Sequence, residues 1–469
     1  MTLVPDGSQD RLLDGCEIIG KAAQDASAPM WEVFAIQSYG QDVEIERGRV
    51  SLAGGGGEGG YCIRVVDSGR TGFAYSTTPD NAVEMVSKAM RTSTLTPAIE
   101  GLELPEDAGS TPVEGMWDPK VDQITPEELM QQADQVIQKV SDLDSRAVVT
   151  GGGMALSCHV GALLTSQGIS SGGRISSHSA GIQVSIDEDD RITSGWSSMG
   201  SRSLVSDFDG MCEEGVEWAI STRNLIDVEK NVEDAQVLFT HRGISGLFSN
   251  IFCSALRGEK LSRGESVWSG KFGQSILASH LSLVDDGRLP GGSSSGTRDG
   301  EGLPTRVTSL IDSGRLVSGI WSTRDAAEQV EAGNVESAYS TGNAGRGGHH
   351  SPPVTSFNNL ILSSSDSQIE RESMIEEMEH GYLVQSVMGA HTANPSSGDF
   401  SVTTSSILRV KDGEVVGAVK QAGLSGNLPA AFSKEVSLAQ MNKATPLWSG
   451  GSIIVPDVLL RQGIRVNSS

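Results

Sequence analysis

The half of the chain that follows Arg257 most constrains the fold, because it alternates short apolar runs with Gly, Ser and Thr. The runs Ile407–Val410 and Gly451–Val455 have the length and the turn-rich flanks of β-strands. A composition shift near Asn231 is followed by a buried-strand pattern, Ala235–Thr240. We therefore predict one β-rich C-terminal domain over 231–469, with helices at about 242–256 and 429–440.

The first half predicts a separate domain over 1–230, since 469 residues exceed the usual size of a single hydrophobic core. Its patterns mix helices and strands, so the fold class expected for the whole chain is α+β. Thr125, Pro126 and Glu128 predict a capped helix, because Thr and Glu three residues apart form a capping box. Four prolines mark a linker at about 95–120. The glycine run Gly54–Gly60 predicts a flexible turn between strands.

Composition excludes several classes of function. The formal charge is −25 with no compensating Lys/Arg cluster, which argues against direct binding of nucleic acid. The sequence contains no run of about 18 apolar residues, so we predict no membrane span, and the N-terminus lacks the pattern of a secretory signal. Five widely spaced Cys without a C-x-x-C pair suit a reducing compartment. We therefore expect a cytoplasmic protein.

Local motifs for other chemistry are weak. Gly54–Gly60 lacks the P-loop pattern, and no G-x-S-x-G elbow indicates a serine hydrolase. The sequence also contains scattered acidic and imidazole side chains that could bind a metal. No further residue is fixed near them as a third ligand, so we interpret them as solvated loop residues. These candidate metal ligands are His349, His350, His380, His391, Glu376, Glu377, Glu379, Asp285 and Asp286.

Several segments together resemble one family. Asn394-Pro-Ser-Ser-Gly398-Asp399-Phe matches an N-P-x-x-G-D-F stretch, and the segments from Asp285 to Gly292 and from Asp299 to Thr305 match two others. On these motifs the chain resembles the TldD/PmbA family, which includes a two-subunit metalloprotease system whose PmbA subunit is also called TldE. The resemblance extends over about residues 31–465.

The zinc motif of the catalytic TldD branch, His-Glu-x-x-x-His, is missing, since none of the eight His is followed by Glu. Counting back from flanking family positions places this motif on Ser249–Ser254. Ser249 and Ser254 then replace the two His, and Asn250 replaces the Glu. The third family ligand, a Cys near the C-terminus, aligns with Trp448–Ile453, which contains no Cys. Hydroxyl and amide groups are poor zinc ligands and cannot act as bases near neutral pH.

This pattern is similar to the PmbA/TldE branch. The resemblance implies a non-catalytic subunit without a cofactor of its own, zinc in a TldD-type partner, and extended peptides as substrate. The expected assembly is a heterodimer, or a homodimer without the partner. Two alternatives stay open: a self-sufficient homodimeric metallopeptidase with an unrecognised metal site, and a peptide-binding scaffold without protease activity. Family loops expected to hold the β-rich domain together or to line a peptide groove contain Asn343, Asn394, Gly398, Asp399, Gly426 and Asn427.

Overall fold

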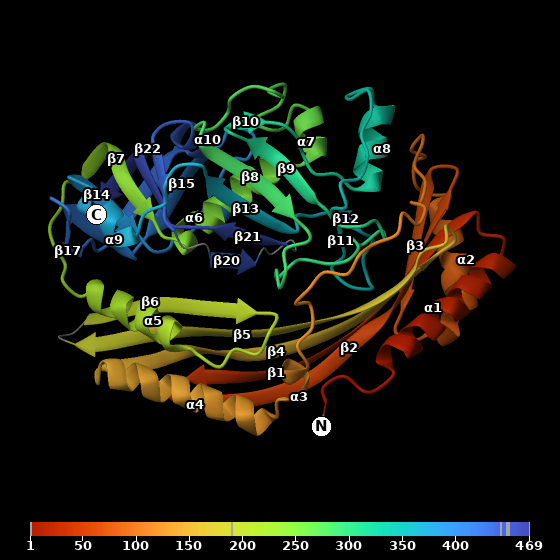
Figure 1. Cartoon of the computed structure of the whole chain (residues 1–469), viewed down its shortest axis with the longest axis horizontal. Coiled ribbons are helices and arrows are strands. Elements are labelled where there is room, and N and C mark those ends of the chain that lie inside the picture. Colours follow the sequence, from red (N-terminus) through yellow and green to blue (C-terminus); the bar gives the residue numbers. More distant parts are fainter. Residues whose placement is uncertain (1, 189–190, 441–442, 447–450, 469) are drawn as a thin grey trace.

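The computed structural model describes residues 2–188, 191–440, 443–446 and 451–468, and its fold class is α+β as predicted. Figure 1 shows a curved sheet from the N-terminal half, with helices on its outer face. The strand-rich C-terminal half lies over the inner, concave face of that sheet. None of the helices in the described ranges is long and apolar enough to cross a membrane.

The N-terminal sheet has six antiparallel strands in the order β3-β2-β1-β4-β5-β6. Four of its strands are 17 to 19 residues long. The strands are β1 (Met30–Glu46), β2 (Arg49–Asp67), β3 (Arg70–Ser76), β4 (Ala147–Thr165), β5 (Ser170–Glu188) and β6 (Arg191–Ser201).

Helices cover the outer face of this sheet and bury one apolar core against it. The capping box at Thr125 is confirmed: Thr125 Oγ1 accepts from Glu128 N at 3.2 Å, and Glu128 Oε2 accepts from Thr125 N at 2.8 Å. The helices are α1 (Ser8–Asp25), η1 (Pro79–Asn81), α2 (Ala82–Ser93), α3 (Pro119–Gln123), α4 (Pro126–Leu143) and α5 (Asp209–Ser221).

The prediction of a turn at Gly54–Gly60 is wrong. These glycines lie inside β2 and pair with Ile36–Asp42 of β1. The chain turns instead at Arg47 and Gly48, whose φ angles of 49° and 73° match the two-residue turn that best fits strand twist. An extended glycine still offers its N–H and C=O to the ladder, so a glycine run does not by itself end a strand.

The C-terminal half contains a six-stranded sheet, an eight-stranded sheet and the small pair β11–β12. In the six-stranded sheet the order is β10-β9-β8-β13-β21-β20, with β8 (Leu281–Asp286), β9 (Val307–Asp312), β10 (Arg315–Leu316), β13 (Asn359–Ser364), β20 (Lys443–Pro446) and β21 (Ser452–Val455). In the eight-stranded sheet the order is β15-β18-β22-β7-β14-β16-β17, and β19 pairs with β22. Its strands are β7 (Asn231–Phe239), β14 (His380–Val384), β15 (Asp399–Thr404), β16 (Ile407–Lys411), β17 (Glu414–Ala418), β18 (Ala422–Asn427), β19 (Val436–Leu438) and β22 (Val458–Ser468).

Short helical segments and the pair β11 (Ala344–Gly345) and β12 (Val354–Thr355) complete this half. The helix predicted at 429–440 is too long, because it ends at Phe432 and Val436–Leu438 pairs with β22 instead. A neighbouring strand thus overrides local helix preference. The helical segments are α6 (His241–Phe248), η2 (Ser249–Cys253), α7 (Gly258–Ser262), α8 (Thr323–Glu331), α9 (Arg371–Glu376), η3 (Ala390–Thr392) and α10 (Leu428–Phe432).

A buried ionic network joins the two halves. Arg64 on β2 donates to Glu32 Oε2 at 2.8 Å and to Glu301 Oε1 at 3.0 Å, and Arg346 also donates to Glu32. The four side chains are at most 5% exposed. Burial raises the pKa of Glu32, but the two guanidinium groups outweigh burial and lower it overall. The family motif residue Glu301 is therefore part of the junction between the halves.

Candidate functional site

The positions aligned with the zinc motif lie on one continuous helical segment in the C-terminal core. Helix α6 leads directly into η2, a π-helical turn over Ser249–Cys253. Ser249, Asn250 and Ser254 are all partly exposed. The Asn250 side chain donates to Gly246 O at 2.8 Å, one turn back on its own helix.

The π-helical turn matters for the spacing of the motif. A π-helix closes hydrogen bonds between positions five apart, so those positions lie nearly above one another. In an α-helix the same two positions point in clearly different directions, because the period is 3.6 residues. Ser249 and Ser254 are five apart, so the local backbone brings together the two positions that align with the family's His pair.

The groups present at these positions do not fit a zinc ion. Two hydroxyls and an amide are neutral and weakly donating, while zinc sites in proteins use imidazole, thiolate and carboxylate. Cys253 is buried, and burial raises the pKa of its thiol so that it stays protonated. In the segment aligned with the third ligand, residues 447–450 lie outside the described residues. Ser452 within it is buried and donates to Asn359 Oδ1 at 2.8 Å.

The other candidate metal ligands are not brought together. His349 packs edge-on against Tyr75, with ring centroids 6.0 Å apart, while His380 and His391 are exposed at separate places. Within 2–188, 191–440, 443–446 and 451–468, no group of three or more His, Cys, Asp or Glu is placed to hold a metal ion.

Asn343 has a buried structural position. Its Nδ2 donates to Asp285 Oδ2 at 2.6 Å and to Ser356 O at 3.0 Å. Asn358 N donates to the other oxygen of Asp285 at 2.8 Å. Burial raises the pKa of Asp285 to about 6 despite these donors. Asn343 is 1% exposed, and its two bonds connect the end of β8 with the segment that leads into β13.

The structure brings the remaining motif residues together at one end of β15 and β18. Asn394 Oδ1 accepts from Ser396 N at 2.9 Å, and Asn427 Nδ2 donates to Asp399 Oδ1 at 2.8 Å. Asn427 Oδ1 also caps α10 by accepting from Ala430 N at 3.0 Å. Gly398 has φ 82°, and a Cβ there would lie 2.5 Å from Pro429. The motif therefore builds a turn, and Gly426 supports it by pairing with Phe400.

The concave face contains a cavity that we did not predict from the sequence. It has a volume of about 800 Å³ and lies between the N-terminal sheet and the loop that contains Ser293, with Gly451 at its wall. The space exists because the residues that face it on adjacent strands are small. Their alternation with larger residues along each strand is the sequence pattern that could have predicted the cavity. In paired positions across the strands they include Gly153, Ala155, Ser177, Ser179, Gly181, Ser198 and Gly200.

The cavity lies beside the start of α6. Arg242 of α6 donates from Nη1 to Ser198 Oγ at 2.7 Å and from Nη2 to Ser198 O at 2.8 Å. Its Nη2 also lies 3.3 Å from Glu214 Oε2 on α5. The helix that carries Ser249, Asn250 and Ser254 is therefore fixed at its N-terminus to the strand that forms one wall of the cavity.

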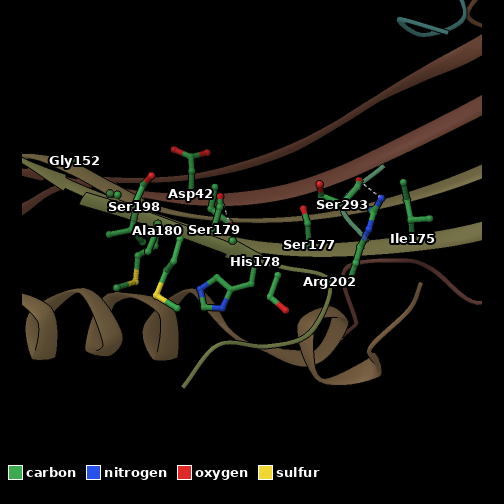
Figure 2. Close-up of a pocket in the computed structure, with 18 of the residues that line it drawn as sticks. Asp42, Gly152, Ile175, Ser177, His178, Ser179, Ala180, Ser198, Arg202 and Ser293 are labelled. Atoms are coloured by element: carbon green, nitrogen blue, oxygen red, sulfur yellow. Dashed lines mark hydrogen bonds between the residues drawn. The ribbon is translucent and has the colours of Figure 1, made fainter. Parts of the chain in front are cut away.

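His178 belongs to the opposite side of the sheet from Asp42 and Ser198, as Figure 2 shows. The imidazole is fully buried, and its Nδ1 accepts from Val205 N at 3.0 Å. This bond requires an unprotonated Nδ1. Burial lowers the pKa of His178 to about 4, so the ring is neutral at physiological pH.

The titration of His178 predicts a loss of stability in acid. The folded-state pKa of about 4 lies below the ordinary His value of 6.5, so the unfolded chain binds the proton first as pH falls. The titration of His178 does not change the free energy of unfolding above pH 6.5. Between pH 6.5 and 4 it lowers that free energy by up to about 3 kcal/mol, since each unit of pKa difference corresponds to 1.36 kcal/mol. Urea unfolding across this range should show a shallower pH slope for His178→Gln than for the wild type. Equal slopes would contradict the assignment.

Comparisons with known proteins agree with this architecture. The family described as PmbA/TldA metallopeptidase C-terminal domain matches residues 233–467, and PmbA/TldA metallopeptidase domain 1 matches residues 31–93. An uncharacterized protein, MJ0231 of Methanocaldococcus jannaschii, is 26% identical over 92% of this chain and 95% of its own. The metalloprotease PmbA of Escherichia coli O157:H7 is 23% identical over 91% of each chain.

The fold is also that of a solved relative. The crystal structure of TldE from Thermococcus kodakarensis superposes with a TM-score of 0.86 at 23% sequence identity, covering 96% of this chain and 99% of that one. The family match extends over half of the chain and includes α6 and η2, which contain the positions aligned with the zinc motif. On these findings, the chain belongs to the TldD/PmbA family of metallopeptidases.

Proposed function

We propose that this chain is the non-catalytic, TldE-like subunit of a cytoplasmic zinc metalloprotease that degrades or processes extended peptides. The observation that supports this most is the helix over α6 and η2. It contains a π-helical turn that brings positions five apart onto one face, yet has Ser249, Asn250 and Ser254 where two ligands and a base would be needed. A TldD-type partner would supply the zinc and the general base.

The contribution of this chain would be to hold substrate. The concave face offers a cavity of about 800 Å³ beside the start of α6, open enough to receive a peptide segment. The outer edge of β6 is less suited to strand addition, because Trp196 O and Ser198 O accept hydrogen bonds from Gln385 and Arg242. The cavity itself is therefore the place where a peptide would be held. A net charge of −25 favours basic or neutral peptides and opposes nucleic acid.

The test is reconstitution with a TldD-type partner that carries His-Glu-x-x-x-His. We expect well under one zinc per chain in this protein purified alone, and a heterodimer of the two chains by native mass spectrometry. Peptide cleavage should require the mixture, because zinc and substrate site lie on different chains. The interface should bury roughly 2,000 Å² or more in total, as obligate subunit pairs do.

Two outcomes would replace this proposal by its rivals. One tightly held zinc per chain, with cleavage by this protein alone, would support a self-sufficient homodimeric metallopeptidase. A partner that stays separate and cleaves peptides equally well without this chain would support a peptide-binding scaffold. As a control, Ser249→His, Asn250→Glu and Ser254→His combined should not create activity in this chain alone, because no Cys aligns with the third ligand.

A further inference from the structure

The cavity on the concave face contains a buried arginine. Arg202 is 7% exposed and follows the end of β6, and Figure 2 shows its side chain reaching toward Ser293. Its Nε donates to Gly292 O at 3.3 Å, its Nη1 lies 3.5 Å from Ser176 O, and its Nη2 donates to Ser293 O. A guanidinium has five N–H donors, so these three bonds leave two for another acceptor.

The charge of Arg202 is not neutralised by this chain. All three acceptors are neutral carbonyls, and no carboxylate in the described ranges forms an ion pair with it. Burial lowers the pKa of Arg202 to about 10, so the group remains a cation at neutral pH. Buried charges in proteins are normally paired, since removing an ion from water without a counter-ion is costly. An anionic ligand would supply the missing partner.

The surroundings of Arg202 suit a single small anion. Burial lowers the pKa of His159, and the nearby charge of Arg202 lowers it further. The His159 Nδ1 atom is 2.8 Å from Ser38 Oγ. Hydroxyl groups of Ser177, Ser293 and Ser294 are also in the lining. Neutral imidazole and hydroxyl groups can donate hydrogen bonds to an anion without adding a competing negative charge.

The other end of the cavity has the opposite charge. Asp42 and Glu44 lie on the face of β1 that lines the cavity, and Asp42 is in register with Ala155 and Ser179. These two carboxylates repel a multiply charged anion such as a phosphate and attract a cationic group. The two ends of the cavity therefore have opposite charge, with Arg202 at one end and two carboxylates toward the other.

We propose that this cavity binds the C-terminal carboxylate of an extended peptide, with Arg202 as its counter-ion and Asp42 and Glu44 facing its basic or N-terminal side. The peptide as ligand rests on the proposed function, but the recognition of its carboxylate does not require the partner. The floor of Gly, Ala and Ser allows a chain to lie against the sheet. Charge-assisted hydrogen bonds between arginine and carboxylate are the strongest polar contacts available at such a site.

The experiment is isothermal titration calorimetry with this chain alone. The probe is an unlabelled octapeptide of Ala, Gly, Ser and Tyr, made once with a free C-terminal carboxylate and once as the C-terminal amide. A third peptide, amidated and with one internal Asp, tests a side-chain carboxylate. We expect the free acid to bind about tenfold more tightly than the amide, the lower end for a hydrogen bond to a charged group.

Variants separate recognition from structure. Arg202→Gln should remove the preference for the free acid, while Arg202→Lys, which keeps the charge, should retain much of it. Both variants lose the fork of carbonyl bonds, so a purely structural role would affect them equally. Arg191→Gln is the matched control, because Arg191 on β6 also donates to two carbonyls, of Thr222 and Arg223, and does not line the cavity. It should bind as the wild type does.

Several results would overturn the carboxylate site. These are equal affinities of acid and amide for the wild type, no binding of any peptide, equal losses in Arg202→Gln and Arg202→Lys, or a preference for the internal Asp over the chain end. Equal affinity of acid and amide would leave the subunit function standing, because peptide binding would persist. Failure to form a heterodimer would remove the subunit function but leave the calorimetric result valid.

Discussion

Arg64→Met should lower the free energy of unfolding by about 3–5 kcal/mol, the range for removing one partner of a buried ion pair. Arg64 contacts Glu32 and Glu301, and both carboxylates are almost fully buried. Without Arg64, Glu301 loses its ion pair, and Glu32 retains only Arg346. Urea unfolding followed by circular dichroism and by tryptophan fluorescence would measure the loss and test whether both halves unfold together.

A surface ion pair gives the control for this experiment. Lys21 and Asp25 are 2.6 Å apart on α1 and are 68% and 64% exposed, so Lys21→Met should change stability by less than about 1 kcal/mol. Similar small effects for Lys21→Met and Arg64→Met would mean that the junction of the two halves is solvated and does not depend on the ionic network. The inference that Glu32, Arg64 and Glu301 hold the halves together would then be wrong.

Gly72→Ala should destabilise the protein by about 3 kcal/mol, near the upper end for overpacking a well-packed site. Gly72 is on β3 where α2 crosses it. A Cβ at Gly72 would lie 1.8 Å from Ala89 O and 2.7 Å from Ser93 N. Both neighbours are backbone atoms of a helix that is packed into the N-terminal core, so neither can turn aside as a side chain would. Thermal unfolding would show the effect as a clear fall in Tm.

Gly56→Ala is the matched control. Gly56 is on β2 of the same sheet, and nothing lies within 4 Å of the position of its Cβ. Alanine there should be neutral or slightly stabilising, since it restricts the unfolded chain without a clash in the folded one. If Gly72→Ala were as stable as Gly56→Ala, the close packing of α2 on β3 would be disproved.

Local chemistry was readable from the sequence. Thr125 and Glu128 are three residues apart, so their capping box needs no distant partner. The proposed loss of the zinc ligands also rests on residue type at positions counted from short motifs, so it can be predicted without a structure. Local signals failed only where a neighbouring strand decided the outcome, as at Gly54–Gly60 and after Phe432.

The sequence by itself therefore determined the α+β class and the family, and it gives Ser249, Asn250 and Ser254 as the residue types at the positions that we align with the zinc motif. The tertiary structure alone showed the cavity, because its floor depends on the register of distant strands, such as β1 and β4, in which Asp42 pairs with Ala155. It also showed that Arg202 meets the carbonyls of Gly292 and Ser293 some 90 positions away. Side-chain charge is a property of the sequence, but whether a charge finds a counter-ion is decided only when distant segments pack together.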